Sequence, residues 1–398
     1  MRANSVCELM GRSLAERPPR RTDRNDSLAA GLVASRTPVK KIGRPLTPKR
    51  PAFAFLVTPK LPLSGRSVKL DVADKATLIP FSQSQGFKFY HFFFKSFNKG
   101  FLNPITVSTS PAFFVWKPAA WLRITGSDAL SFLQGQFTND LRQVANGAVY
   151  GLWLTLKGKV LGDGFVLAGA EPEEFWIGSY TTPAAVLRER LESFIIADDV
   201  TVEDQTSDWG AVSIFGSVPL ERFGRSGGAE FIFPGRRSQP ANVEWVFRGD
   251  VEGEVRRALQ DLPELDLDAV ETIRISAGIP AVPADIGPND LPNEAGLEDE
   301  AISFTKGCYL GQEVMARLKS MGQVRRRLLR IRGKGPRPMP GAALYGGERK
   351  VGELRSVVAD GTDEYVGLAM VSLINLAGQS ELALSPQALP TVTILDPR

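Results

Sequence analysis

The chain has few of the residues that most often act as enzymatic nucleophiles, bases or metal ligands. Its 398 residues include two cysteines, Cys7 and Cys308, and one histidine, His91. Two cysteines cannot build a disulfide framework, which is typical of a protein from a reducing compartment. Residues 111–398 contain one cysteine and no histidine. This excludes from them a cysteine–histidine dyad, a serine–histidine triad and a zinc site of the usual ligands, so we predict no metal site there.

Long apolar runs are lacking as well. No stretch approaches the roughly 20 apolar residues that cross a membrane as a helix, so we expect no membrane partner. The hydrophobic fraction of 43% and the charged fraction of 23% are ordinary for a soluble globular protein. A chain of this length has room for two domains, or for one large domain with subdomains.

Acidic residues are scarce in the first part of the chain and in excess elsewhere. Residues 1–110 hold 19 Lys and Arg against 6 Asp and Glu, whereas the remainder holds 29 against 38. An acidic body argues against broad nucleic-acid binding, because phosphates are neutralised by a positive surface. The arginine cluster at residues 325–332 leaves two interpretations open, a solvated strand face or a contact for an anionic partner. A nucleic-acid-binding module is therefore the least favoured of three functional hypotheses.

The first 110 residues differ from the rest in composition. Residues 1–110 are basic, and their first half is rich in arginine, proline and serine without sustained apolar periodicity. This composition predicts a disordered N-terminal extension with no role in the chemistry. Its arginines are typical of a transit peptide, but its acidic residues argue against one. We expect a cytoplasmic protein, with the mitochondrial matrix as the alternative if the extension is a transit peptide.

Residues 111–322 alternate between strand and helix patterns and predict an α+β domain. Residues 150–156 and 160–167 have the pattern of two strands, and the KGK sequence of residues 157–159 supplies the turn of a hairpin. Residues 182–194 have apolar positions at helical spacing. The pattern changes after Gln323, where short strands separated by glycine and proline turns predict a small antiparallel β-barrel over residues 323–398.

The most informative stretch is residues 306–317, KGCYLGQEVMAR. It places Cys308 between two glycines and two residues after Lys306, just ahead of a short helical pattern. Nearby cations and helix N-termini favour the thiolate, which is the reactive form of cysteine. A lone cysteine is more often a buried structural residue, but the full twelve-residue string favours a functional thiol.

This string resembles the K-G-C-Y-x-G-Q-E-x-x-A-R signature of the YgfZ-type folate-binding proteins, relatives of the glycine-cleavage T-protein (aminomethyltransferase). Four other pieces resemble motifs of that family and occur in the expected order. They are LQGQFTND at residues 133–140, KGK at 157–159, RISAGIP at 274–280 and LPNE at 291–294. Each piece alone is weak, but the cysteine motif with the others in order is specific, and the resemblance covers roughly residues 111–398.

The resemblance implies a fold, a cofactor and a function. The expected fold is α+β, with T-protein-like folate-binding α/β subdomains around a central cavity plus a small C-terminal antiparallel β-barrel. The expected cofactor is tetrahydrofolate, and the expected partners are iron–sulfur client proteins or cluster-assembly factors. The leading hypothesis is a tetrahydrofolate-binding accessory factor for iron–sulfur cluster assembly or repair, with Cys308 as the key reactive residue. Because such clusters are usually held by four cysteines, one thiol needs a partner to share the ligands.

Three residues are candidates for the chemistry: Cys308, Lys306 and Asp163. Lys306 is a cation that activates the thiol, a partner of a carboxylate, or an ordinary exposed lysine. Asp163 matches one of the paired aspartates that support aminomethyl transfer in the T-protein, but the other position is occupied here by Gly162. The missing carboxylate favours the accessory factor over the alternative, a folate-dependent one-carbon transferase or demethylase. Whether the chain is an enzyme stays open.

Six residues are candidates for binding the folate, because they lie in the motifs and offer charged, amide or aromatic groups: Glu294, Gln312, Glu313, Arg317, Arg274 and Tyr309. A reduced pterin has a polar edge suited to carboxylate or amide contacts, and its acidic tail suits arginine or lysine. By resemblance, Glu294 contacts the pterin edge, whereas Arg274 belongs either to the cavity or to a buried ion pair.

The candidates in the cysteine motif have simpler structural alternatives. Glu313 and Arg317 are four residues apart, so on a helix they either pair with each other or bind the ligand. Gln312 either reads a pterin edge or forms part of a loop or helix cap. Tyr309 either stacks on a flat ring or packs internally.

Overall fold

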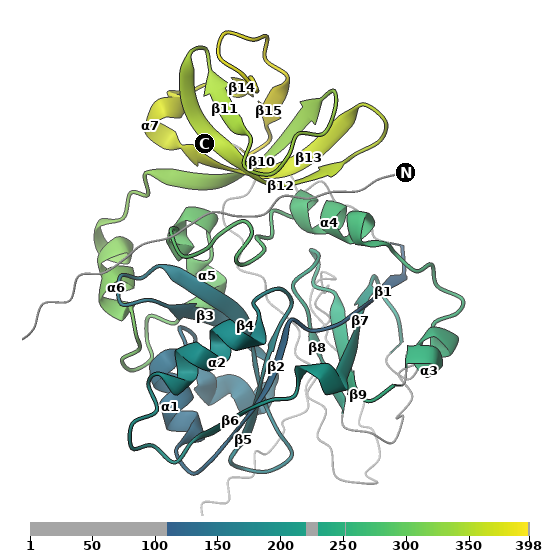
Figure 1. Cartoon of the computed structure of the whole chain (residues 1–398), viewed down its shortest axis with the longest axis vertical. Coiled ribbons are helices and arrows are strands. Elements are labelled where there is room, and N and C mark those ends of the chain that lie inside the picture. The colour runs from purple at the N-terminus through teal and green to yellow at the C-terminus, as the bar shows by residue number, and fades with distance from the viewer. Residues whose placement is uncertain (1–109, 220–229, 251, 397–398) are drawn as a thin grey trace, which may run out of the picture. The chain divides into compact units, whose positions relative to one another are not determined.

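The described part of the chain is built on three antiparallel sheets. The computed structural model describes residues 110–219, 230–250 and 252–396, so the predicted N-terminal extension lies outside the described residues except for its last position (Figure 1). The sheets have five, four and six strands, and helices are interspersed between the strands. This mixture confirms the predicted α+β class.

The five-stranded sheet contains the predicted hairpin. Its order is β3-β4-β5-β2-β6, and its strands are β2 (Ala120–Thr125), β3 (Val149–Leu154), β4 (Val160–Ala168), β5 (Glu174–Ser179) and β6 (Thr201–Asp204). Strands β3 and β4 pair antiparallel, as predicted. Gly158 in their turn has φ of 69°, and a Cβ there would lie 2.9 Å from Val314. The turn therefore packs directly against the segment that follows Cys308.

Helices cover one face of this sheet. They are α1 (Ala129–Gln136), the 3-10 helix η1 (Leu141–Asn146) and α2 (Ala184–Glu192). Leu133 of α1 and Leu187 of α2 are fully buried and belong to one hydrophobic cluster with Leu122 and Ile177 of the sheet. Burial of these apolar side chains on the side of each helix that faces the sheet fixes α1 and α2 on the sheet.

The four-stranded sheet has the order β1-β7-β9-β8. Its elements are β1 (Ala112–Trp116), β7 (Trp209–Phe215), β8 (Glu230–Pro234) and β9 (Val243–Arg248), with the 3-10 helix η2 (Thr206–Asp208) ahead of β7 and helix α3 (Glu252–Ala258) after β9. Val255 of α3 packs in one cluster with Val212 and Phe247 of the sheet.

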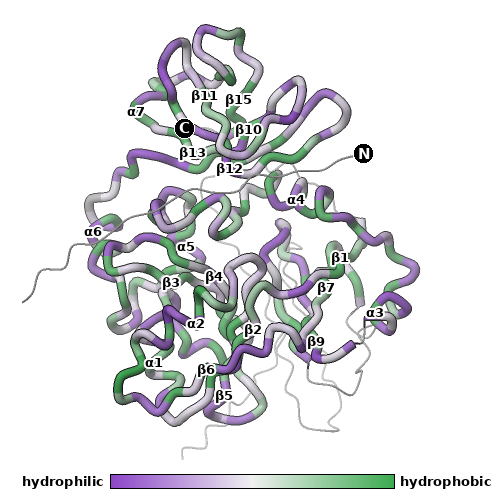
Figure 2. The backbone as a smooth tube through the Cα atoms, in the orientation of Figure 1, coloured by the Kyte–Doolittle hydropathy of each residue, from purple (hydrophilic) through white to green (hydrophobic). Residues whose placement is uncertain are grey.

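Aromatic side chains join the two sheets. Trp121 and Trp176 of the five-stranded sheet share a cluster with Trp209 and Phe233 of the four-stranded sheet. The Trp209 ring lies 5.4 Å from that of Trp121 and 5.0 Å from that of Trp176, between ring centroids. In Figure 2 the tube is largely hydrophobic along β2 and β4 and largely hydrophilic along α3. The two sheets thus form the inner layers, with helices on the outer face of each.

Four short helices follow the four-stranded sheet and carry most of the sequence motifs. They are α4 (Leu267–Ser276), the 3-10 helix η4 (Pro292–Ala295), α5 (Glu298–Ala301) and α6 (Gln312–Met321). Asp266 caps α4, because its side chain accepts a hydrogen bond of 2.8 Å from the Ala269 amide. Among the described helices, none is long and apolar enough to cross a membrane.

The predicted C-terminal barrel is confirmed as a six-stranded antiparallel sheet that nearly closes. Its order is β11-β12-β13-β10-β15-β14, with β10 (Arg326–Lys334), β11 (Ala343–Gly346), β12 (Arg349–Ala359), β13 (Glu364–Ser372), α7 (Leu373–Leu376), β14 (Glu381–Leu382) and β15 (Val392–Ile394). Tyr345 and Ala383 exchange two backbone hydrogen bonds of 2.8 and 2.9 Å between the end strands. This single bridge joins the two ends of the sheet, next to β14.

The sequence patterns did not predict five of the strands, and they predicted one helix that is longer than the one observed. Strands β1, β5, β8, β11 and β14 were not predicted, and the shortest have four and two residues, too few to show an alternating period. The helical pattern of residues 253–262 predicts a helix over that whole range, but α3 ends at Ala258. Pro263 disfavours a helical conformation at Leu262 only, so it excludes the last predicted residue and does not explain the end at Ala258.

Packing of the aromatic layer predicts the effect of a single methyl group. A Cβ at Gly178 of β5 would overlap the ring of Trp121, which is 1% exposed. Gly178→Ala should therefore lower the free energy of unfolding by about 1–3 kcal/mol through overpacking. Gly253→Ala is the matched control, since nothing lies within 4 Å of a Cβ there, and alanine in α3 should raise stability by roughly 0.4–1 kcal/mol. Urea denaturation measures both, and equal stabilities would contradict the packing argument.

Candidate functional site

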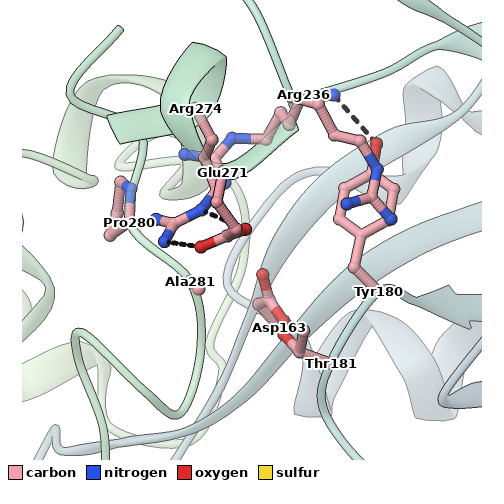
Figure 3. Close-up of a pocket in the computed structure, with 9 residues that line it drawn as sticks. Asp163, Tyr180, Thr181, Arg236, Glu271, Arg274, Pro280 and Ala281 are labelled. Atoms are coloured by element: carbon pink, nitrogen blue, oxygen red, sulfur yellow. Dashed lines mark hydrogen bonds and ion pairs between the residues drawn. The ribbon is translucent and has the colours of Figure 1, made fainter. Parts of the chain in front are cut away.

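A pocket lies where the two sheets meet helix α4. Its lining residues come from four segments of the chain: Asp163, Tyr180, Thr181, Arg236, Arg237, Glu271, Arg274, Pro280 and Ala281. Figure 3 shows the Asp163 carboxylate pointing into the space between Glu271 and Tyr180. The pocket volume of about 30 Å³ has room for one or two water molecules. A ligand larger than this enters only if lining side chains move.

Asp163 is the buried acid of the pocket. It lies on β4 and is 4% exposed. Its Oδ1 accepts hydrogen bonds from the hydroxyls of Thr182 at 3.0 Å and Ser179 at 3.3 Å, and its Oδ2 accepts one from Tyr150 at 3.0 Å. Burial raises the pKa of Asp163, and the charge of Arg236 opposes the rise. A carboxyl held this way is equipped to accept or exchange a proton with a bound group.

Two adjacent arginines enter the pocket from the loop between β8 and β9. Arg236 forms an ion pair with Glu300 of α5, and its guanidinium lies 4.1 Å from the Tyr150 ring centroid. Arg237 is 8% exposed, and its guanidinium lies 4.2 Å from the Tyr180 ring centroid and 4.7 Å from that of Trp116. Such contacts between a cation and ring faces hold a guanidinium in place.

The charge of Arg237 has a weak counterion. Its Nε has no hydrogen-bond partner among the described residues, and its ion-pair partner, Glu244, lies 3.9 Å away. The Glu244 oxygen involved already accepts hydrogen bonds from Tyr180 at 2.7 Å and Asn242 at 2.6 Å. Burial raises the pKa of Glu244. Arg237 is therefore a cation at the wall of the pocket whose Nε–H is unpaired among the described residues.

Arg274 lines the pocket and also takes part in a buried ion pair, so both alternatives raised from the sequence describe its position. It donates to Asp285 at 2.7 Å and to the Ile279 carbonyl at 2.6 Å. Two further bonds, of 3.0 and 2.5 Å, run to the carboxylate of Glu271. A fifth, of 3.0 Å, reaches Ser356 of the barrel. Since its donors are all engaged, Arg274 holds α4, the following loop and the barrel together.

Glu294 lies outside the pocket lining, in η4. Its carboxylate accepts a hydrogen bond of 2.8 Å from the Leu291 amide and two, of 3.0 and 2.9 Å, from Arg326 of β10. Arg326 also pairs with the buried Asp290 at 3.0 Å. Both oxygens of Glu294 are thus bonded within the protein, and the residue ties η4 to the barrel.

The cysteine motif forms a second region. Cys308 is exposed, in the loop ahead of α6. Lys306, two residues earlier, is buried, and its ammonium donates to three backbone carbonyls, those of Gln134, Phe137 and Asn139, at 2.7, 2.6 and 2.8 Å. Burial lowers the pKa of Lys306 to about 8. All three ammonium protons have acceptors, so Lys306 joins the cysteine motif to the motif of residues 133–140.

The remaining candidates lie around the start of α6. Tyr309 is buried, which raises its pKa to about 12, and its hydroxyl has no hydrogen-bond partner among the described residues. Glu313 and Arg317 are exposed and pair with each other at 2.9 Å. Gln312 is half-buried, and its backbone N–H donates to the Tyr309 carbonyl at 3.2 Å. None of the four lines the pocket.

Of the nine candidate residues, the structure brings Asp163 and Arg274 together in the pocket and places the others elsewhere. Sequence reasoning missed Tyr180, Arg236 and Arg237, which line the pocket, and Tyr150, which bonds to Asp163. The pair of arginines after the β8 pattern, in PGRRS, was the available signal: two adjacent cations beside a strand rich in aromatics. In the described residues, no three or more His, Cys, Asp or Glu side chains are grouped to hold a metal ion.

Two family matches divide along the same lines as the fold. Residues 107–219 match the GCVT N-terminal domain family, and residues 325–394 match the CAF17 C-terminal beta-barrel domain family. The crystal structure of the glycine cleavage system aminomethyltransferase T from Bartonella henselae is similar, with a TM-score of 0.59 and 16% sequence identity. The superposition covers 71% of this chain and 84% of the aminomethyltransferase. At this sequence identity the similarity shows the fold alone.

Three relatives align with 61–70% of this chain. The mitochondrial iron–sulfur cluster assembly factor IBA57 of Homo sapiens is 30% identical, over 67% of this chain and 79% of its own length. The IBA57 protein of Mus musculus is 28% identical, over 70% and 82%. The tRNA-modifying protein YgfZ of Aliivibrio fischeri is 27% identical, over 61% and 78%. The chain therefore belongs to the YgfZ and IBA57 family of proteins related to the glycine-cleavage T-protein.

Proposed function

We propose that this chain is an accessory factor in iron–sulfur cluster assembly that binds a reduced folate in the Asp163 pocket and presents Cys308 to a partner protein. Its IBA57 relatives are named as assembly factors for such clusters. The observation that carries the proposal is the physical arrangement of the motifs, with a polar pocket inside a T-protein-like fold and an exposed thiol outside it.

The pocket has groups suited to a reduced pterin. Asp163 supplies a buried carboxylate for ring N–H groups, and Arg237 supplies an unused Nε–H donor for a carbonyl or carboxylate. Tyr180, which lines the pocket, and Tyr150, whose hydroxyl bonds to Asp163, add aromatic rings for a flat ligand to contact. Binding requires the pocket to open, because its present volume of about 30 Å³ is that of one or two waters.

The thiol lies apart from the proposed folate pocket. Cys308 is exposed and lies outside the residues that line the pocket. One cysteine cannot hold an iron–sulfur cluster by itself, because these clusters are usually held by four. In the proposal, partner proteins, either cluster-assembly factors or clients, provide the remaining cluster ligands or contact the thiol directly. Glu294 has a structural role in linking η4 to the barrel, and the Glu313–Arg317 pair lies on the surface of α6.

A folate-dependent one-carbon transferase is the second candidate, favoured by the buried Asp163 in a T-protein-like fold. Asp163 would exchange a proton with the folate or the amine. Formation of methylene-tetrahydrofolate and ammonia from tetrahydrofolate and an aminomethyl donor, lost in Asp163→Asn, would establish this activity. If the wild-type chain binds folate but forms no methylene-tetrahydrofolate, this candidate is removed.

Localisation follows the relatives. The IBA57 proteins of Homo sapiens and Mus musculus are named as mitochondrial, which supports the matrix alternative over the cytoplasmic expectation. Immunoblotting of mitochondrial and cytosolic fractions from the source cells distinguishes the two compartments.

The folate proposal predicts a loss of affinity in pocket variants. Asp163→Asn and Arg237→Met should each weaken tetrahydrofolate binding at least about tenfold, because a hydrogen bond to a charged group contributes roughly 1.5–3 kcal/mol. Isothermal titration calorimetry on the full chain under reducing conditions measures this. Asp208→Asn is the control, since that carboxylate is about half exposed and pairs with Arg248 on the surface. Equal affinities in all four proteins, or no binding by the wild type, would overturn the assignment.

The thiol proposal predicts a separation of functions. Cys308→Ser should abolish complementation of a strain that lacks this protein, while folate affinity and thermal stability stay at wild-type values, because the side chain is exposed and lies outside the pocket lining. Full rescue by Cys308→Ser would show that the thiol is dispensable. Loss of folate binding in the same variant would show instead that the two regions are one site.

A further inference from the structure

Entry of a ligand requires one of the pocket side chains to move, and the contacts of the three arginines indicate which one. Arg274 is held by Asp285, which is fully buried, and by a half-buried carboxylate on its own helix. Arg237 is enclosed by aromatic rings. Arg236, in contrast, pairs with Glu300, whose side chain is 47% exposed. When the Arg236–Glu300 pair breaks, water solvates the released carboxylate, but the Arg236 side chain is 12% exposed, so its charge needs the entering ligand as a new partner.

Glu300 and Tyr150 both connect Arg236 to Asn139. The Asn139 side-chain amide donates to the backbone carbonyls of Glu300 at 3.0 Å and Tyr150 at 2.8 Å, whereas Arg236 contacts the side chains of the same two residues. The Tyr150 ring lies against the Arg236 guanidinium, and its hydroxyl bonds to Asp163. The two protons of one amide group therefore contact both neighbours of Arg236.

Asn139 in turn contacts the cysteine motif. Its carbonyl accepts a hydrogen bond of 2.8 Å from the ammonium of Lys306, two residues before Cys308. Lys306 has no carboxylate partner within 4.0 Å among the described residues, so its position depends on the three carbonyls. A shift of Asn139 changes one of these three bonds and thereby the anchoring of the loop that bears the thiol.

We propose that a ligand entering the Asp163 pocket displaces Arg236 from Glu300, and that Asn139 and Lys306 transmit this change to the Cys308 loop, so that pocket occupancy raises the reactivity of the thiol. Asn139 acts as a positioning residue, and Arg236 is the element with two states. The identity of the ligand rests on the proposed function. The link itself rests on contacts within the chain.

The test measures how fast Cys308 reacts with N-ethylmaleimide in the full chain carrying Cys7→Ser, followed by mass spectrometry. Addition of 5-formyltetrahydrofolate should raise the rate at least about fivefold, the lower end of typical coupling between sites. Arg236→Met and Glu300→Gln should each raise the rate without ligand, because each breaks the ion pair. Asn139→Ala should remove the effect of ligand while calorimetry still detects binding. Arg248→Met, which alters a surface ion pair on β9, should leave the rate unchanged.

The outcomes separate the link from the folate assignment. If folate binds but neither it nor the two ion-pair variants alters the rate, the link is overturned and the folate pocket stands. If folate does not bind, the folate assignment fails, and the rates of Arg236→Met and Glu300→Gln still decide the link. Glu300→Gln guards against misfolding, since its side chain is about half exposed. An equal rise in Arg248→Met would also overturn the proposal, because the change would then be general.

Discussion

The buried ammonium of Lys306 is the contact on which the arrangement of the motifs depends. A buried charge is costly unless its hydrogen bonds are satisfied, and here three carbonyls satisfy them. Two of the three carbonyls belong to the last turn of α1 and its C-cap, where backbone oxygens lack partners within the helix and the helix dipole is negative. The lysine thus supplies hydrogen-bond donors to the free carbonyls at the end of α1, and these carbonyls stabilise the buried charge of the lysine. This mutual need explains why two motifs more than 160 residues apart act as one unit.

Arginines connect the barrel to the α+β body. Arg326 joins β10 to η4, and Arg330 donates to the Ser276 carbonyl at 2.9 Å. Arg274 makes the reverse connection, from α4 to Ser356 of β12. The arginine cluster of the sequence left open a solvated face or an anionic partner. The structure shows that two of its members instead hold the two parts of the chain against each other, Arg326 through ion pairs with Asp290 and Glu294 and Arg330 through its hydrogen bond to Ser276.

Local patterns predicted most of the elements but only part of the site. The β3–β4 hairpin was visible because alternating apolar residues flank a glycine turn, and the barrel strands were visible because turns separate them. The motif residues predicted Asp163 and Arg274, which do meet in the pocket. Arg236, Arg237 and Tyr180 could not be placed, because their proximity arises when two sheets pack face to face, and no local period records such packing. The same holds for Lys306, whose partners lie far away along the chain.

Closure of the barrel limits how this part of the protein meets others. An open sheet presents a row of unpaired backbone groups at its edge, on which another chain can add a strand. Here the two end strands bond to each other through Tyr345 and Ala383, so little unpaired backbone is left for strand addition. The barrel is consequently protected from edge-to-edge aggregation. A partner protein that binds the barrel must therefore contact its side chains and loops, and the specificity of that binding follows from the chemistry of those side chains.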